Sequence, residues 1–235
     1  MIPLLTIDKQ ALFFGIQSID CAFQGFKFGN FAVLSGHPIC KTLIFQLCVH
    51  CQLPKEKGGL DSSTIYIDGG NSFNPYEIST IAREFGSDPR SALERVFVSR
   101  AFTAYQLSAI VLETLEDAIK HYRSKLILIS KITSLFLDRD VPTKEALEIF
   151  HKMIIRLADL ALRRNIIVVA TYSNGERSKR QAFLESILLG RADKTARFTE
   201  DKGRLQLSIE KHGFPEALTV DVLRNEATLE KFVEA

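Results

Sequence analysis

The sequence has no long apolar run, no signal-like start and almost no excess charge, and each of these absences excludes a class of protein. No run approaches the roughly 18 apolar residues that a membrane-spanning helix needs, so we expect no membrane association. The first ten residues include Asp8 and Lys9 and lack the basic start and apolar stretch of a signal peptide. A formal net charge of +2 over 235 residues excludes a histone-like or polybasic protein.

Cysteine is also scarce, and its four positions lie within the first quarter of the chain, at 21, 40, 48 and 51. A disulfide scaffold would have denser cysteines spread along the chain. Cys48 and Cys51 have the spacing of a metal or redox pair, but no second ligand pair follows at zinc-finger distance. Their place in an apolar helical pattern favours buried structural thiols. We therefore expect a cytoplasmic protein with no metal site.

Short apolar runs alternate with longer helical patterns, which favours βαβ units and a parallel sheet. Strands are expected at 31–34, 64–68, 95–99, 125–129 and 165–170. Helices are expected at 41–52, from about 75, at 104–122 and at 144–164. Three strands expected to be antiparallel follow at 195–198, 204–209 and 217–222. The sequence thus predicts one α/β domain over 1–235 with a mostly parallel, helix-flanked sheet, an antiparallel C-terminal edge and a lead-in segment at 1–14.

The loop after the first expected strand has the context of a phosphate-binding loop, with a strand before it and a helix directly after it. In the pattern G-x-x-x-x-G-K-[ST], both glycine positions are altered, to Ser35 and Cys40, while Lys41 and Thr42 are kept. Such a loop aims backbone N–H groups at phosphates, and Pro38 has no N–H to offer. We expect no required cofactor and only weak affinity for ATP or ADP. The residues of this degenerate loop are Ser35, Gly36, His37, Cys40, Lys41 and Thr42.

Several further segments, in the right order, make the chain resemble the RecA-type ATPase core of the recombinase family that comprises RadA and its eukaryotic Rad relatives. The segments are Gly15 to Asp20, Phe28-Gly29, Lys41 through Pro54 to Asp68, Arg100-Ala101-Phe102, and Arg156 to Asp159. The resemblance implies a RecA-like P-loop fold and a role in homologous recombination and DNA repair. It also implies that the small N-terminal helical domain of full recombinases is absent.

The chain departs from this family at the residues that would carry out the chemistry. The family places a glutamate that activates water two positions after Asp68, where this chain has Gly70. The aspartate that would organise magnesium is replaced by Ser130, next to Lys131, and the family's Asn-Gln after the fifth strand by Thr171-Tyr172-Ser173. Losses of this kind commonly cost orders of magnitude in rate. We expect no efficient ATPase and assign no catalytic residue.

The resemblance also implies a DNA-binding segment, because the family's loops after the fifth strand line the DNA path. Here that segment is short and basic, and we take Arg177, Lys179 and Arg180 as its candidate contacts. Basic side chains there would contact phosphates of single-stranded DNA without sequence selectivity. An ordinary solvated loop is an equal alternative. Arg191, Lys194 and Arg197 would extend the same patch.

A second surface follows from how the family assembles, since neighbouring cores capture a peptide beside the second and third strands. The corresponding positions here are Ile65, Ile67, Phe97 and Ser99, which also suit ordinary core. We therefore expect a non-catalytic or weakly catalytic RadA paralogue that modulates recombination by binding a recombinase, a paralogue or single-stranded DNA. Homo-oligomers are a further option. The alternative is a divergent, DNA-dependent ATPase that uses Lys41 and Thr42.

Overall fold

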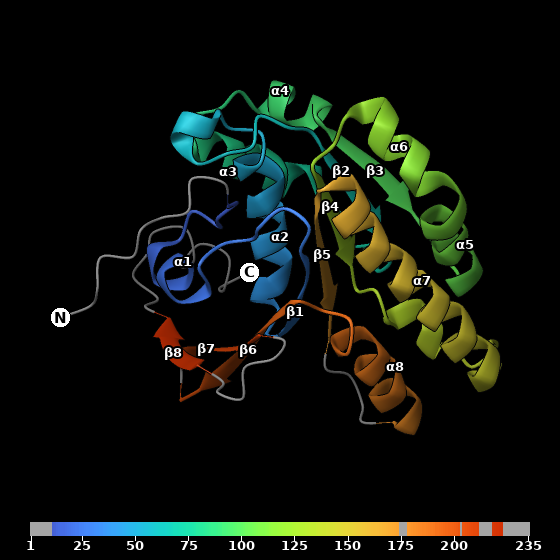
Figure 1. Ribbon diagram of the computed structural model, residues 1–235. Coiled ribbons are helices and arrows are strands. Elements are labelled where there is room, and N and C mark those ends of the chain that lie inside the picture. The colour runs from blue at the N-terminus through green and yellow to red at the C-terminus, as the bar shows by residue number, and fades with distance from the viewer. Residues whose placement is uncertain (1–10, 174–177, 203, 212–217, 223–235) are drawn as a thin grey trace.

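The computed structural model describes residues 11–173, 178–202, 204–211 and 218–222, and in them a twisted sheet carries helices on both faces (Figure 1). The described strands lie in the order β3-β2-β4-β5-β1-β6-β7-β8. Their bounds are β1 Phe31–Gly36, β2 Thr64–Asp68, β3 Val96–Arg100, β4 Leu126–Ser130, β5 Ile167–Tyr172, β6 Lys194–Asp201, β7 Arg204–Lys211 and β8 Leu218–Val222. This architecture is the α/β, RecA-like arrangement that the sequence predicts.

The central strands are parallel because a helical crossover returns the chain to the same end of the sheet after each of them. β4 lies between β2 and β5, and all its residues are buried. Its continuously apolar sequence suits a strand covered on both faces. The first five predicted strands are confirmed to within two residues at each end. Their carboxyl ends meet at one end of the sheet, where α/β proteins place their ligand sites.

One strand direction differs from the prediction. β6 pairs parallel with β1, with Ala32 opposite Lys194, and only its other edge pairs antiparallel, with β7. The physical reason is α8 (Lys179–Leu189), which carries the chain back across the sheet before β6 begins. The prediction of an antiparallel edge is therefore confirmed for β7 and β8 and wrong for β6 on its β1 side.

The helices start and end at recognisable signals. α3 (Pro75–Glu84) begins with proline at its first position, after Asn74 accepts a hydrogen bond from the backbone N–H of Tyr76 at 3.0 Å. The predicted helix over 104–122 is one continuous helix whose turns change at Ile110–Thr114 to π-helical. The other bounds are α1 Gln17–Phe23, α2 Ile39–His50, α4 Pro89–Glu94, α5 Ala104–Ala109, α6 Leu115–Tyr122 and α7 Thr143–Arg164.

Two apolar cores lie on the two faces of the sheet. The first lies under α1, α2 and α3, and it includes an aromatic cluster of Phe14, Phe23 and Phe26 with ring centroids 4.7–5.5 Å apart. The second lies under α5 to α8. The end of the predicted lead-in segment belongs to the first core, since Leu12 is buried and bridges to Phe26. Among the described residues, none of the helices combines the length and apolarity that crossing a bilayer requires.

Candidate nucleotide site

The degenerate loop lies where β1 ends and α2 begins, at the carboxyl ends of the strands. Gly36 ends β1 with a positive φ of +98°. A Cβ atom at this position would lie 2.0 Å from the backbone oxygen of Phe198 on β6. Only glycine fits so close an approach at such a dihedral angle. Gly36, which is not one of the two motif glycines, is therefore required by the contact between β1 and β6.

The backbone N–H groups of this loop already have acceptors within the chain. A phosphate cradle works because consecutive N–H groups point at a common anion, and Pro38 has none to offer. The hydrogen bonds are His37 N to Phe198 O at 2.8 Å, Ile39 N to His37 Nδ1 at 3.2 Å, Cys40 N to His37 O at 3.1 Å, and Lys41 N to Pro38 O at 3.0 Å. The loop is thus a tight turn into α2 and leaves no open cradle among these four donors.

The cation that would meet phosphate is paired with a carboxylate. Lys41 Nζ lies 2.6 Å from Glu77 Oε1 on α3, and Asn74 Nδ2 donates to the same oxygen at 2.9 Å. The Lys41 side chain remains 43% exposed and Glu77 19%. In a working loop this lysine reaches the β- and γ-phosphates. Here a ligand phosphate would have to displace Glu77 first.

A second carboxylate flanks the loop from β6. His37 Nε2 lies 3.3 Å from Glu200 Oε2. Because His37 Nδ1 accepts the hydrogen bond from Ile39, Nε2 carries the hydrogen and donates to Glu200. Glu77 and Glu200 thus place negative charge on two sides of the loop. Burial raises the pKa of the Cys40 thiol to about 12, so this side chain is neutral and unreactive at physiological pH.

Asp68, at the carboxyl end of β2, is fully buried and saturated with donors. Burial disfavours its charge, but the N–H groups of Ser72 and Phe73 and the hydroxyl of Ser130 outweigh burial and lower the pKa of Asp68. Arg100 Nε lies 3.4 Å from Oδ2. The other donors to its two oxygens are Gly70 N at 3.2 Å, Ser72 N at 3.0 Å, Ser72 Oγ at 3.3 Å, Phe73 N at 2.9 Å and Ser130 Oγ at 2.8 Å. The carboxylate is therefore occupied as a structural acceptor.

Ser130 and Gly70 stand at the positions of the family's metal ligand and catalytic glutamate, and both donate hydrogen bonds to Asp68. Ser130, in place of the aspartate, donates to Asp68. Lys131 adopts a left-handed φ of +47° and packs its aliphatic stem on Gly70, where a Cβ atom would lie 2.4 Å from Lys131 Cδ. The space beside Gly70 is therefore filled by Lys131. Within the described residues no group of three or more His, Cys, Asp or Glu could hold a metal ion.

The last two residues of β5 and Ser173 directly after them have a structural role at this end of the sheet. Thr171 accepts a hydrogen bond from Lys131 N through Oγ1 at 3.0 Å and another from Ile132 N through its backbone oxygen at 2.8 Å. Tyr172 is buried, and Arg197 Nη2 donates to its hydroxyl at 3.4 Å. Ser173 accepts through its backbone oxygen from Gln181 Nε2 at 3.4 Å. These residues fasten β5 to β4 and α8.

The candidate DNA contacts are not equivalent in the structure. Lys179 is exposed at the start of α8, whereas Arg180 turns inward and donates to the backbone oxygen of Val141 at 3.0 Å. Arg177 lies outside the described residues. Lys194 is buried, 3.8 Å from the centroid of the Phe23 ring, and donates to the backbone oxygens of Phe23 and Gly25. Lys194 therefore cannot extend a basic surface, which corrects that expectation.

The candidate peptide positions lie at the β3 edge but differ in access. Ile65 and Ile67 on β2 are buried in the second core. On β3, Phe97 is half-buried and its ring stacks on Tyr122 with centroids 3.6 Å apart, and Ser99 is half-buried. Val98 on the same strand is 40% exposed. An edge strand is present, while the side chains of Ile65 and Ile67 are already packed within the chain.

Sequence reasoning missed the two carboxylates that flank the loop. Glu77 lies three residues after Asn74, which is the spacing of a capping box, so its position near a helix start was readable from the sequence. Glu200 had no local signal, because its approach to His37 depends on the parallel pairing of β6 with β1. The other cysteines behave as predicted near α2, since Cys48 and Cys51 are buried, while Cys21 is exposed.

Comparison with known proteins finds a family and a relative that resemble this chain. A family model described as Rad51 matches residues 15–186. A DNA repair and recombination protein RadA of Aeropyrum pernix is 32% identical over 133 residues, which is 54% of this chain and 40% of that relative. The chain thus matches less than half of the relative's length.

Proposed function

Because the chain belongs to the Rad51 family, we propose that it acts in DNA recombination and repair by binding other molecules and that it does not hydrolyse ATP efficiently. The observation that carries the proposal is the pairing of Lys41 with Glu77 above a loop whose N–H groups are already bonded. Its partners would be a RadA-type recombinase, a paralogue or single-stranded DNA.

Phosphoryl transfer depends on positioned donors, a metal ion and a group that orients the attacking water. Four N–H groups of the loop are already bonded within the chain, Asp68 accepts several hydrogen bonds, and Lys131 fills the space beside Gly70. Loss of one such stabilising group typically costs about 3 kcal/mol of transition-state stabilisation. Three such changes at one site support the proposal that the residues at the family's nucleotide site have a structural role in this chain.

A titration with a fluorescent ATP analogue, with and without magnesium, tests this proposal directly. We expect any binding that depends on Lys41 to have a Kd weaker than about 1 mM, which corresponds to roughly −4 kcal/mol of binding free energy, and no magnesium-dependent release of phosphate. The variant Lys41→Ala should change neither result, and Lys152→Ala, at an exposed position on α7, is its matched control. Micromolar binding and turnover that Lys41→Ala abolishes would contradict the proposal.

The alternative function is a divergent, DNA-dependent ATPase that uses Lys41 and Thr42. Two observations favour it: the strand–loop–helix context is intact, and Lys41 keeps 43% of its side chain exposed. For this function, ATP would have to draw Lys41 away from Glu77. Turnover measured with and without single-stranded DNA decides between the two functions, because only the alternative predicts stimulation by DNA.

For partner capture we propose the β3 edge, where an extended peptide could add a strand. The exposed fractions of its apolar side chains are 40% for Val98, 64% for Phe102 and 46% for Tyr105. Phe102→Glu should weaken co-purification with a RadA-type recombinase at least tenfold. Tyr76→Glu, at a side chain that is 82% exposed on α3, is the matched control. Equal losses for both variants would count against the β3 edge.

For DNA we propose the basic segment before and at the start of α8. Arg177→Gln with Lys179→Gln should lower the affinity for a fluorescent oligo(dT) and flatten its salt dependence by about two charges. Arg180→Gln should act mainly on stability, because Arg180 holds the backbone oxygen of Val141. If the double variant binds oligo(dT) as the unmodified protein does, DNA contact through this segment is wrong.

A further inference from the structure

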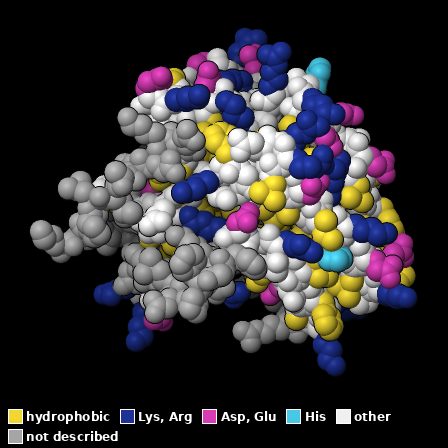
Figure 2. Space-filling view, viewed as in Figure 1, with side chains coloured by type: hydrophobic (Ala, Val, Ile, Leu, Met, Phe, Trp, Pro, Cys, Tyr) yellow, Lys and Arg dark blue, Asp and Glu magenta, His cyan; other side chains and the backbone are white. Residues whose placement is uncertain are grey.

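A basic pocket lies at the end of the sheet opposite the degenerate loop. Its volume is about 620 Å³, and its lining residues come from the segments that precede β1, β2, β4 and β5 and from the ends of α6 and α7. Figure 2 shows dark-blue Lys and Arg side chains over the upper part of the molecule, where β4 and β5 begin in Figure 1. The five cations that line the pocket are Lys55, Lys120, Arg123, Lys125 and Arg164.

The charge of this pocket is not balanced by its own lining, which contains no carboxylate. Two of the cations have carboxylate partners just outside, since Lys120 pairs with Asp117 at 3.1 Å and Arg164 pairs with Glu116. Lys125 Nζ donates to the backbone oxygen of Leu60 at 3.2 Å, and no ion pair of Lys125 occurs among the residues that the structure describes. Within the described residues, no ion pair of Lys55 or Arg123 is present. Three cations are therefore available to an incoming anion.

The helix ends at this pocket reduce the positive charge without cancelling it. α6 ends at Tyr122 and α7 at Arg164, and each helix carboxyl end carries about half a negative charge. Cations in the last turn of a helix are common for this reason alone. Lys55 and Lys125 belong to neither of these two helices. With the two helix ends and the two outside carboxylates counted, roughly two positive charges remain over the pocket.

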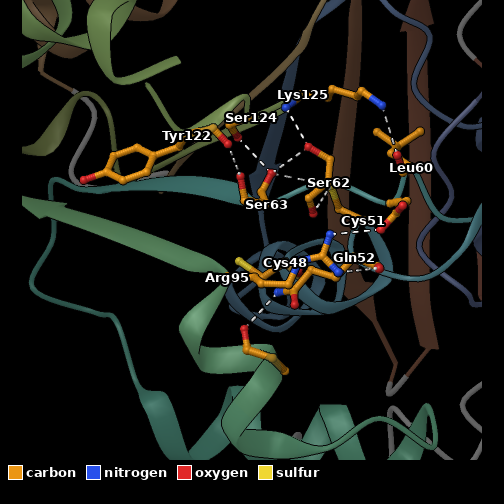
Figure 3. A network of polar contacts seen from close by, with 12 residues as sticks. Cys48, Cys51, Gln52, Leu60, Ser62, Ser63, Arg95, Tyr122, Ser124 and Lys125 are labelled. Atoms are coloured by element: carbon orange, nitrogen blue, oxygen red, sulfur yellow. Dashed lines mark hydrogen bonds and ion pairs between the residues drawn. The ribbon is translucent and has the colours of Figure 1, made fainter. Parts of the chain in front are cut away.

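The segments that carry these cations are fixed to each other before any ligand binds (Figure 3). Lys125 N donates to Ser62 Oγ at 2.9 Å, Ser124 Oγ donates to the backbone oxygen of Ser63 at 2.8 Å, and Ser63 Oγ donates to that of Tyr122 at 3.0 Å. These bonds join the segment before β2 to the segment before β4. Such preorganisation reduces the entropy that a ligand would have to remove on binding.

The floor of the pocket is apolar. Leu60, Ile119 and Ile166 are each at most 5% exposed, and Phe28 is half-buried beside them. Pockets of 300–1,000 Å³ with an apolar lining and a few convergent polar groups are typical small-molecule sites. An apolar floor with an aromatic ring accommodates a flat base, and the cations on the rim accommodate phosphate. A simple inorganic anion would leave the floor unused.

We propose that this pocket binds a nucleotide phosphate ester, with its phosphate on Lys55, Arg123 and Lys125 and its base over Phe28 and the apolar floor. The ligand is either a free nucleotide or the 5′-phosphorylated end of a single strand. The site is separate from the degenerate loop at Lys41, because the two lie at opposite ends of the strands. The proposal therefore does not depend on whether the loop binds ATP.

The test uses the full chain and isothermal titration with AMP, with tripolyphosphate, and with oligo(dT) carrying either a 5′-phosphate or a 5′-hydroxyl. The test variant is Lys55→Gln with Arg123→Asn, since asparagine tolerates the left-handed conformation of Arg123 (φ +51°). The matched control is Arg83→Gln with Lys152→Gln, two exposed cations outside the pocket. Thermal unfolding checks that both double variants fold.

We expect the test variant to bind AMP or the 5′-phosphorylated strand at least tenfold more weakly, while the control and Lys41→Ala stay within about twofold. Phe28→Leu should weaken AMP but not tripolyphosphate. AMP binding that persists in the presence of the phosphorylated strand assigns the pocket to free nucleotides. Binding of the phosphorylated strand that persists in the presence of AMP assigns the pocket to strand ends. Equal binding of all probes to test and control variants would overturn the proposal. Competition by poly-glutamate as strong as by AMP would overturn it in favour of an acidic peptide.

Discussion

The two ends of the parallel sheet treat charge in opposite ways. At the carboxyl ends, the main polar groups of the site have partners in the chain: Lys41 pairs with Glu77, His37 donates to Glu200, and Asp68 accepts from Arg100 and from several N–H and hydroxyl donors. At the amino ends, Lys55 and Arg123 line a pocket with no carboxylate in its lining. The end that the family uses for nucleotide is internally neutralised, and the other end retains the chemistry of an anion site.

The comparison shows that the groups of a ligand site can be engaged within the protein even where the residues themselves are kept. Lys41 and Thr42 are still present, yet the loop N–H groups, the lysine and the neighbouring acidic residue are all engaged within the protein. Substitutions that break or restore single contacts at the two ends of the sheet should therefore change the free energy of unfolding or the ligand affinity by very different amounts.

The largest effect is expected at Asp68. Asp68→Ala would leave several buried donors and Arg100 without their acceptor, and a loss of about 3–5 kcal/mol in the free energy of unfolding is expected from such a site. Chemical denaturation at pH 7 measures it. Asp88→Ala, which removes an exposed helix cap at α4, is the control with a much smaller loss.

Asp68 also predicts that the free energy of unfolding depends on pH. The pKa of Asp68 is lower in the folded protein than its ordinary value, so its stabilising contribution is present above that ordinary value and is lost as pH falls through the lowered folded pKa. The stability difference between the unmodified protein and Asp68→Asn should thus narrow below about pH 4. A difference that stayed constant from pH 7 to pH 2 would show that Asp68 is not charged in the fold.

A smaller effect, on ATP affinity, is expected from substitutions that make the loop flexible and free Lys41. Pro38→Gly, Cys40→Gly and Glu77→Gln together restore the flexibility and the free lysine that a phosphate loop needs, and ATP affinity should rise about tenfold, or roughly 1.4 kcal/mol. The control replaces Glu77→Gln with Glu84→Gln, at an exposed glutamate of the same helix. Turnover should remain absent in both, since Asp68, Ser130 and Lys131 are unchanged.

The smallest effect is an increase in AMP affinity, expected on substitution of Glu116, which borders the basic pocket. Hydrogen bonds from Arg164 and Arg156 outweigh desolvation and lower the pKa of Glu116 to about 2, so Arg164 stays neutralised throughout the physiological range. Glu116→Gln would release Arg164 toward the pocket and should raise AMP affinity about twofold to threefold at low salt. Glu113→Gln, an exposed residue one turn earlier, should leave it unchanged.

The parts of this molecule that could be predicted from the sequence depend on local patterns. β4 follows from four successive apolar residues, the α3 start from Asn74 and Pro75, and the loop position from the strand–helix context around Lys41. The family resemblance added the order of the elements. Each of these signals lies within a few residues of what it specifies.

The parts that could not be predicted depend on contacts between distant segments. The parallel pairing of β6 requires knowing that α8 crosses the sheet, and Glu200 reaches His37 only through that pairing. Lys194 and Arg180 look like surface cations, yet each donates to backbone oxygens of a distant segment. The basic pocket could not be predicted from the sequence, because its cations come from separate segments of the chain.

The π-helical turn at Ile110–Thr114 has a consequence for how this protein could change over evolutionary time. A π turn contains one residue more than an α turn, and each α-helical residue rotates the helix by about 100°. Because the extra residue is contained within one turn, deletion of a single residue there would give a regular helix in which α6 keeps its rotation relative to α5. Glu116 would then still face α7, and Lys120 and Arg123 would still face the pocket. The same deletion within the regular part of α6 would rotate every following residue by about 100°, so the π turn is the position in this helix where a change of length alters the surface least.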